Sequence, residues 1–221
     1  MSIKQLIKSV PLLYKSALYV KERFNIIKPN SKYLFSGEGI CYKTKIRVRG
    51  GNNSIKVGLG SCIRESSIII NGNNNLIEID ENCQLGKCTS ILIEGDNHYL
   101  KIGANSTFTQ YVHLCLQEYN TKIILGNDCM LSNHIIIRTS DSHSIYNSVG
   151  CRINQAADVI MGNHVWICPN ATIMKGVTIG DNVIIASNAL VTSNVASNVM
   201  VGGIPAKIMK RDCLWTREKL W

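Results

Sequence analysis

From residue 161 onward, hydrophobic side chains return every six residues. The large aliphatic positions are Met161, Ile167, Ile173, Ile179, Ile185 and Val191. A smaller apolar residue follows each of them four positions later, and these are Val165, Ala171, Val177, Val183, Ala189 and Val195. Neither an α-helix nor an alternating strand has a period of six. The repeat therefore indicates stacked units that bury one continuous core together.

The chain before this region repeats with a longer period. An aliphatic residue followed by glycine or aspartate recurs at intervals of 22, 23 and 23 residues, at Val57-Gly58, Ile79-Asp80, Ile102-Gly103 and Leu125-Gly126. A six-residue unit with a large and a small apolar position describes a short flat strand followed by a corner. Three such sides close a triangular coil of about 18 residues, and the longer early coils have one extended corner. We therefore predict an all-β, parallel β-helix over residues 40–200.

Asparagine content supports this prediction. The chain has 22 asparagines but only 3 phenylalanines. Asparagine competes with helical hydrogen bonds and tolerates the left-handed backbone conformation that tight corners need. A helical bundle is thus disfavoured, and many short strands joined by turns are favoured.

The two ends of the chain show different patterns. Residues 1–30 predict an amphipathic helical segment that Pro11 interrupts, with apolar residues on one face and lysines on the other. This segment either packs against the protein or makes peripheral contact with an anionic membrane through residues 1–28. Lysines divide every apolar stretch, so we expect no transmembrane span and no secretory signal. For residues 201–221 we predict a C-terminal cap with a short helix.

Charge and cysteine content restrict the expected binding partners and cellular compartment. The net charge of +9 favours an anionic partner, but basic and aromatic residues are not interleaved, which argues against nucleic acid. Nine scattered cysteines without a CxxC pair indicate neither a disulfide framework nor a zinc site. We expect a cytoplasmic protein, with a possible peripheral position on the inner face of the membrane.

The repeat breaks once, over about residues 140–158. This polar segment contains Asp141-x-His143. Long excursions from a rigid scaffold commonly carry functional groups, and histidine is the most frequent acid–base residue. A solvated loop histidine and a turn-forming Asp141 are the plain alternatives.

The tract GNHVWICPNATIMKGVTIGDNVIIASNALVTSNVASNVMVGGIPAKIMK, residues 162–210, resembles the hexapeptide-repeat acyltransferases, specifically their sugar and capsular-polysaccharide O-acetyltransferase branch. VGGIPAKIM, residues 201–209, matches the closing motif of that branch. The resemblance covers roughly residues 45–210. It implies a left-handed parallel β-helix, a homotrimer and acetyl-CoA as donor substrate, bound in the groove between two subunits.

The resemblance also implies roles for particular residues. His143 would be the general base that takes a proton from a sugar hydroxyl and later protonates the CoA thiolate, and Asp141 would hold or stabilise its ring. Trp166 would line the site near the thioester, and His113 lies where relatives place an acceptor-binding asparagine. Packing of Trp166 against another subunit and a structural role for His113 remain open.

Further positions in the motif imply contacts to the donor. Ser187 and Thr192 would face the pantetheine arm, while Lys207 and Lys210 would meet the adenosine phosphates. A solvated basic surface is the alternative for the two lysines. The chain departs from the pattern where Ser193 replaces a common basic residue, and where Cys168 and Ala186 replace glycines.

We therefore predict an O-acetyltransferase that uses acetyl-CoA to modify a saccharide hydroxyl in capsule, O-antigen or exopolysaccharide synthesis. N-acetylation of a nucleotide-linked amino sugar is the alternative reaction, and a non-catalytic β-solenoid is the alternative class. Carbonic anhydrases with this fold bind zinc through closely spaced histidines, a spacing that His134 and His143 do not provide, so no metal is expected. The acceptor sugar, the hydroxyl modified and the exact acyl group stay open.

Overall fold

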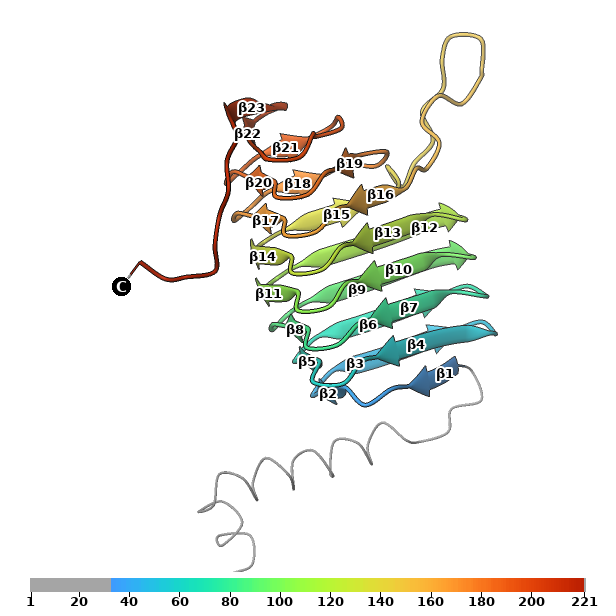
Figure 1. The fold of residues 1–221 in the computed structure, drawn as a ribbon. Helices are drawn as coiled ribbons and strands as arrows, with labels where there is room; N and C mark the ends of the chain where they lie inside the picture. The colour runs from blue at the N-terminus through green and yellow to red at the C-terminus, as the bar shows by residue number, and fades with distance from the viewer. Residues whose placement is uncertain (1–32, 221) are drawn as a thin grey trace, which may run out of the picture.

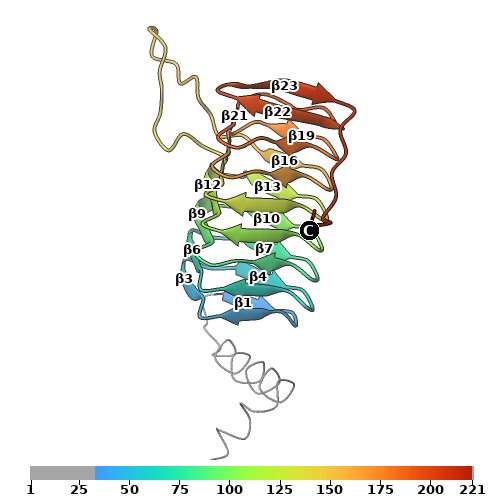
Figure 2. The ribbon, with the colours of Figure 1, turned by 90° about the vertical axis from the view of Figure 1, so that its left-hand side faces the viewer.

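A computed structural model describes residues 33–220, and they form a parallel β-helix whose strands stack into three sheets (Figures 1 and 2). The predicted N-terminal helical segment lies outside the described residues. The coil begins at Tyr33, a few residues before the predicted start. Within residues 33–220 no helix is long and apolar enough to cross a membrane.

The first sheet runs, in spatial order, through β1 (Tyr33–Ser36), β4 (Asn53–Val57), β7 (Leu76–Ile79), β10 (Tyr99–Ile102), β13 (Lys122–Leu125), β16 (Val159–Met161) and β19 (Thr178–Ile179). The second contains β2 (Ile40–Tyr42), β5 (Cys62–Arg64), β8 (Gln84–Leu85), β11 (Thr107–Gln110), β14 (Met130–Asn133), β17 (Trp166–Ile167), β20 (Ile184–Ile185), β22 (Val199–Gly203) and β23 (Ala206–Arg211). The third contains β3 (Lys45–Arg49), β6 (Ser67–Asn71), β9 (Ser90–Asp96), β12 (His113–Tyr119), β15 (Ile136–Arg138), β18 (Thr172–Ile173) and β21 (Leu190–Val191).

The core fills the inside of the coil as the repeat predicts. Both apolar positions of each hexad are buried from Met161 to Val195, and so are the four aliphatic residues of the longer coils. Large aliphatic side chains stack directly above one another because parallel registers align them, as in the pair Ile137 and Ile173. Burial of this continuous column is the main stabilising contribution.

The corners account for the asparagine content. Among residues 33–220, twenty residues other than glycine have a positive φ, and ten of them are asparagine. Several of these asparagines also stack in amide pairs from coil to coil, as Asn97 and Asn120 do at 3.0 Å. The left-handed conformation costs asparagine less than most residues, so asparagine supplies half of these positions.

The C-terminal region differs from the sequence-based prediction. β22 and β23 form an antiparallel hairpin, and residues 212–220 continue as an extended tail without a helix. The tail runs back along the coil (Figure 1). Trp215 holds it there by stacking on His164 at 3.9 Å, and Arg217 donates to Thr107 Oγ1 and to the carbonyl of Cys129. These contacts with residues far away in sequence hold the tail in an extended conformation, and no local helical hydrogen bonds form in it.

Candidate active site

The loop that breaks the repeat is the main projection from the coil. Residues 140–158 leave after β15 and return at β16, standing well away from the stacked strands (Figures 1 and 2). A bridge between Tyr146 and Arg152 pairs its two arms, and the Asn147 side chain closes its tip by accepting from the Cys151 amide. The loop is thus an ordered arm rather than a loose excursion.

Asp141 anchors the base of this arm. Its Oδ2 accepts hydrogen bonds from Lys175 Nζ at 2.6 Å and from Asn154 Nδ2 at 2.9 Å. The bond from Lys175, followed by that from Asn154, lowers the pKa of Asp141 despite partial burial. Lys175 comes from the corner between β18 and β19, so a later coil fixes the loop.

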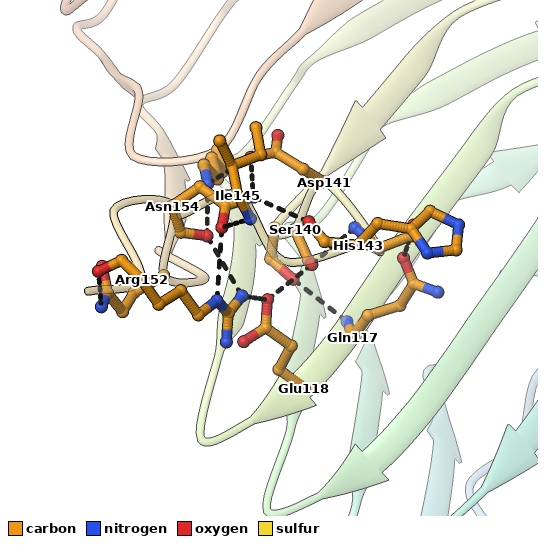
Figure 3. A network of polar contacts seen from close by, with 12 residues as sticks. Gln117, Glu118, Ser140, Asp141, His143, Ile145, Arg152 and Asn154 are labelled. Carbon is orange, nitrogen blue, oxygen red and sulfur yellow. Dashed lines mark hydrogen bonds and ion pairs between the residues drawn. The ribbon is translucent and has the colours of Figure 1, made fainter. Parts of the chain in front are cut away.

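Asn154 connects this anchor to His143. Its amide is only 7% exposed and donates to the His143 carbonyl at 2.8 Å, while its Oδ1 accepts from the Ile145 amide at 2.8 Å. The backbone that directly follows the His143 side chain is therefore held in place by Asn154. The ring itself is exposed, and Figure 3 shows it pointing away from Asn154.

The predicted relation between Asp141 and His143 takes a different form in the structure. Among residues 33–220, no hydrogen bond joins the Asp141 carboxylate to the His143 ring. Lys175 and Asn154 donate hydrogen bonds to the carboxylate instead, and Asn154 also donates to the His143 carbonyl. Asp141 is thus linked to the His143 backbone through Asn154. Whether either residue acts in catalysis stays a prediction.

A second polar cluster supports the loop from below. Glu118 Oε1 accepts from Arg152 Nη2 and from Ser140 Oγ, both at 2.7 Å. The bond from Arg152 is the largest cause of the lowered pKa of Glu118. Because Arg152 is in the returning arm and Ser140 is at the base of the outgoing arm, Glu118 ties both arms to β12.

Arg138 and Gln117 hold the segment that directly precedes His143. Arg138 Nε donates to the Ser140 carbonyl at 2.7 Å, and Arg138 Nη2 donates to Ser142 Oγ at 2.8 Å. The Ser142 hydroxyl donates in turn to Gln117 Oε1 at 2.7 Å (Figure 3). Ser142 has a φ of 68°, a left-handed conformation that these bonds stabilise.

His113 lies on the outer face of β12, on the same sheet from which the loop departs. It is opposite Ile136 of β15 and is half-buried. Burial lowers its pKa, and the Arg138 charge adds to this shift. A neutral His113 beside a fixed cation can donate or accept a hydrogen bond from a sugar hydroxyl.

The predicted donor-binding residues lie elsewhere on the surface. Trp166 is on β17 of the second sheet and faces outward, where it meets the tail residue Trp215 with ring centroids 5.8 Å apart. Lys207 and Lys210 are exposed on β23 of the same sheet. No contact among residues 33–220 brings these three to His143, because the second and third sheets are different sides of the coil.

Ser187 and Thr192 border the third sheet, which is also the sheet from which the loop departs. Both are exposed, Ser187 on the corner between β20 and β21, and Thr192 directly after β21 in the third sheet. The registers through β18 place the end of β21 two coils above the end of β15. Thr192 thus lies above the point where the loop departs.

Sequence reasoning missed the residues that position the loop, namely Lys175, Asn154, Arg138, Glu118 and Gln117. A break in the repeat marks the loop, but no pattern marks its partners. Lys175, Glu118 and Gln117 lie 22 to 34 residues away from the loop residues that they bond. Arg138 and Asn154 are nearer in sequence, but no repeat distinguishes them from other polar residues. Within the described residues, no group of histidine, cysteine and acidic side chains is arranged to hold a metal ion.

Comparisons with known proteins identify the class that this fold and loop define. The family described as bacterial transferase hexapeptide (six repeats) matches residues 158–193. A polysialic acid O-acetyltransferase of Neisseria meningitidis is 35% identical over 192 residues, which cover 86% of this chain and 87% of the relative.

Solved structures agree with this comparison. The polysialic acid O-acetyltransferase OatWY superposes with a TM-score of 0.77 at 34% identity, covering 85% of this chain and 92% of that one. A galactoside acetyltransferase in complex with coenzyme A has a TM-score of 0.50 at 21% identity, covers 61% of this chain and 64% of that one, and shows similarity of fold alone. The chain is a hexapeptide-repeat acyltransferase, and it belongs to the family of the polysialic acid O-acetyltransferases.

Proposed function

We propose that this protein transfers an acetyl group from acetyl-CoA to a hydroxyl of a sialic acid-containing capsular polysaccharide, with His143 as general base. The observation that carries the proposal is the exposed His143 ring on a loop fixed by Asp141, Asn154 and Lys175. The long match to a polysialic acid O-acetyltransferase supports the class of acceptor. It also favours O-acetylation over the alternative N-acetylation.

The proposed reaction is a direct transfer. The His143 imidazole removes the proton of the sugar hydroxyl while the oxygen attacks the thioester carbonyl, which gives a tetrahedral oxyanion. Collapse of this intermediate breaks the carbon–sulfur bond. The imidazolium then gives its proton to the departing CoA thiolate, and His143 returns to its starting state.

Asp141 is a positioning residue in this mechanism. It holds Asn154, which in turn fixes the carbonyl of His143 and the amide of Ile145. A ring carried on such a fixed backbone reaches its acceptor with little further loss of entropy. His113 and Arg138, on the face below the loop, are placed to contact the acceptor sugar.

The donor site in this proposal is completed by a second subunit. His143 projects from the third sheet, whereas Trp166, Lys207 and Lys210 lie on the second sheet of the same chain. In a homotrimer the loop of one subunit can face the second sheet of its neighbour, and acetyl-CoA would bind between them. Ser187 and Thr192 would then line the pantetheine arm, and the two lysines would meet the phosphates.

The proposal includes a cytoplasmic protein, where acetyl-CoA and capsule precursors meet. All nine cysteines are free, which suits a reducing compartment. Contact of residues 1–28 with an anionic inner membrane surface belongs to the same proposal.

Acetyl transfer to polysialic acid, measured by mass spectrometry, tests the function. Mass detection is preferable to a thiol reagent because Cys88 and Cys151 are exposed and would react as well. His143→Asn should lower kcat by about 100-fold or more. His134→Asn is the matched control, since His134 is an exposed histidine at the opposite end of β15 from the loop, with its ring stacked on Tyr111, and it should retain activity. Equal activity of both variants would contradict the mechanism, and no transfer by the wild type would contradict the acceptor.

Mixed oligomers test the shared site. His143→Asn and Trp166→Ala subunits, each inactive alone, should regain activity when co-expressed, because some interfaces then combine an intact loop with an intact second sheet. Absence of any recovery in verified mixed oligomers would place the whole site in one chain.

A further inference from the structure

The outer face of the third sheet carries a row of side chains that leads to the loop. The registers of five adjacent parallel strands, β3, β6, β9, β12 and β15, align one residue from each, in the order Arg47, Ile69, Leu92, Cys115 and Arg138. Neighbouring strands are about 4.8 Å apart, so the row is roughly 19 Å long. An arginine stands at each end. Between the arginines, Ile69 and Leu92 are half-buried, and Cys115 is buried.

The end of this row far from the loop is strongly cationic. Lys45, Arg47 and Arg49 are exposed and point outward from β3, since Val48 between them is buried inside the coil. No carboxylate among residues 33–220 forms an ion pair with any of the three. Three unpaired cations on one short strand form a surface that attracts a polyanion.

The other end of the row belongs to the candidate active site. Arg138 bonds the Ser140 carbonyl and the Ser142 hydroxyl, directly before His143. His113 is on the neighbouring strand of the same face and in the same line as Lys45, through Ser67 and Ser90. The face thus connects a cationic patch to the base of the catalytic loop without a change of sheet.

We propose that this face is a binding track for an anionic polysaccharide, which places successive sugar units of the polymer between the β3 cations and His143. The carboxylates of the polymer would pair with Arg47, Arg49 and Arg138, and the apolar faces of its sugar rings would lie over Ile69 and Leu92. The inference deepens the proposed function by naming the acceptor surface. It also predicts a preference for chains long enough to span both ends.

One carboxylate opposes this charge pattern and provides a test of it. Glu94 is exposed on β9, in the line that also contains Arg49 and Asn71, and it accepts a hydrogen bond from Gln117 Nε2 at 2.7 Å. Its charge should repel an anionic chain. Glu94→Gln removes that charge and leaves an amide oxygen that can still accept from Gln117, so polyanion affinity should rise about two- to threefold.

Binding of fluorescently labelled long-chain polysialic acid to the full protein, measured by anisotropy without acetyl-CoA, tests the track independently of catalysis. Arg47→Gln with Arg49→Gln should raise the Kd about tenfold at low salt, and the difference should shrink at high salt. The matched control is Arg64→Gln with Lys122→Gln, which removes two exposed cations from the other two sheets. The control should retain more than half of the wild-type affinity.

Each outcome of this experiment decides the inference. Selective loss of affinity in the Arg47/Arg49 variant, with a gain for Glu94→Gln, supports the track even if acetyl transfer to this polymer is absent. Equal losses of affinity in the test and control variants would mean that net charge alone attracts the polymer, and they would overturn the inference. An absence of wild-type binding, or an unchanged Kd in the Arg47/Arg49 variant, overturns it as well, whatever the activity of the enzyme.

Discussion

Hydrogen-bonded partners determine the position of the loop side chains. His143 has no polar partner for its ring among residues 33–220, yet Asn154 fixes its carbonyl and the amide of Ile145. Asn154 is in turn held by Asp141, and Asp141 by Lys175. The exposed histidine therefore depends on a chain of three positioning residues, of which only Asp141 lies within a few residues of it in sequence.

Lys175→Met tests this chain of contacts. Losing the ammonium should raise the pKa of Asp141 towards its ordinary value and loosen the loop by about 1 to 2 kcal/mol. We expect roughly tenfold faster hydrogen exchange at the Ile145 amide, together with a lower kcat and a nearly unchanged KM for acetyl-CoA. Lys122→Met, on an exposed strand position of the first sheet, is the control and should leave both unchanged. Unaltered exchange in Lys175→Met would show that the ion pair does not anchor the loop.

The same anchor predicts a dependence on pH. The pKa of Asp141 is lower in the folded protein than in the unfolded chain, so its stabilisation is complete above the ordinary carboxyl pKa and is lost as pH falls through the lowered one. Protection of the Ile145 amide, corrected for intrinsic exchange, should therefore fall in acid in the wild type. In Lys175→Met this fall should be smaller and should be complete at a higher pH, because the folded-state pKa lies closer to the ordinary one.

At the scale of the element, the C-terminal tail acts as a strap along the second sheet. Trp215 is 7% exposed, its Nε1 donates to the His164 carbonyl at 2.9 Å, and its own carbonyl pairs with His164 Nε2 at 2.9 Å. The same indole contacts the ring of Trp166. The tail therefore determines the surroundings of a residue that we place at the donor site.

Trp215→Ala should release this strap. Loss of the buried ring and its stacking should cost about 2 to 3 kcal/mol, and the detached tail should be cut faster by trypsin at Arg217. Iodide should then quench Trp166 fluorescence more strongly. Leu214→Ala is the control, because Leu214 is on the same tail but 75% exposed, and it should behave like the wild type. Slow cleavage in both variants would mean that Trp215 is not the fastening point.

At the scale of the whole molecule, the coil is a stack in which each turn contacts only its neighbours. Close approach between turns depends on glycine at several corners, and Gly72 is one of them. A Cβ on Gly72, which has a φ of +154°, would lie 1.8 Å from the Gly95 carbonyl oxygen. The turns cannot separate at this point without breaking the ladders on both sides.

Gly72→Ala should thus destabilise the fold by about 3 kcal/mol, which lowers Tm by roughly 6 to 12 °C for a chain of this size. Gly150→Ala is the comparison, since Gly150 also has a positive φ but a Cβ there would meet nothing within 4 Å. It should lower Tm by less than about 3 °C, because strain at the loop tip stays local. Similar Tm values for the two variants would contradict the importance of close stacking. Scanning calorimetry provides the measurement.

The hexad pattern predicted the coil because its information is local. From Met161 to Val195 each residue's inward or outward position follows from the residues six before and six after it, and all the predicted inward positions are buried. The outward position of Trp166 and the loop at residues 140–158 followed from the same repeat. The expected C-terminal helix was wrong, because hydrogen bonds from Trp215 and Arg217 to residues 51 to 112 positions away replaced local ones.

By itself the sequence determined the coil, its corners and the loop, since a repeat and its interruption are properties of neighbours along the chain. The class of enzyme followed from the resemblance of residues 162–210 to a known family. Only the tertiary structure decided what holds the loop and which surfaces lie beside it. Stacking brings Lys175 to Asp141, Arg152 to Glu118 and Arg47 into line with Arg138. Whether two such residues meet depends on the lengths of all the coils between them in the chain. No local sequence pattern encodes the combined length of those coils.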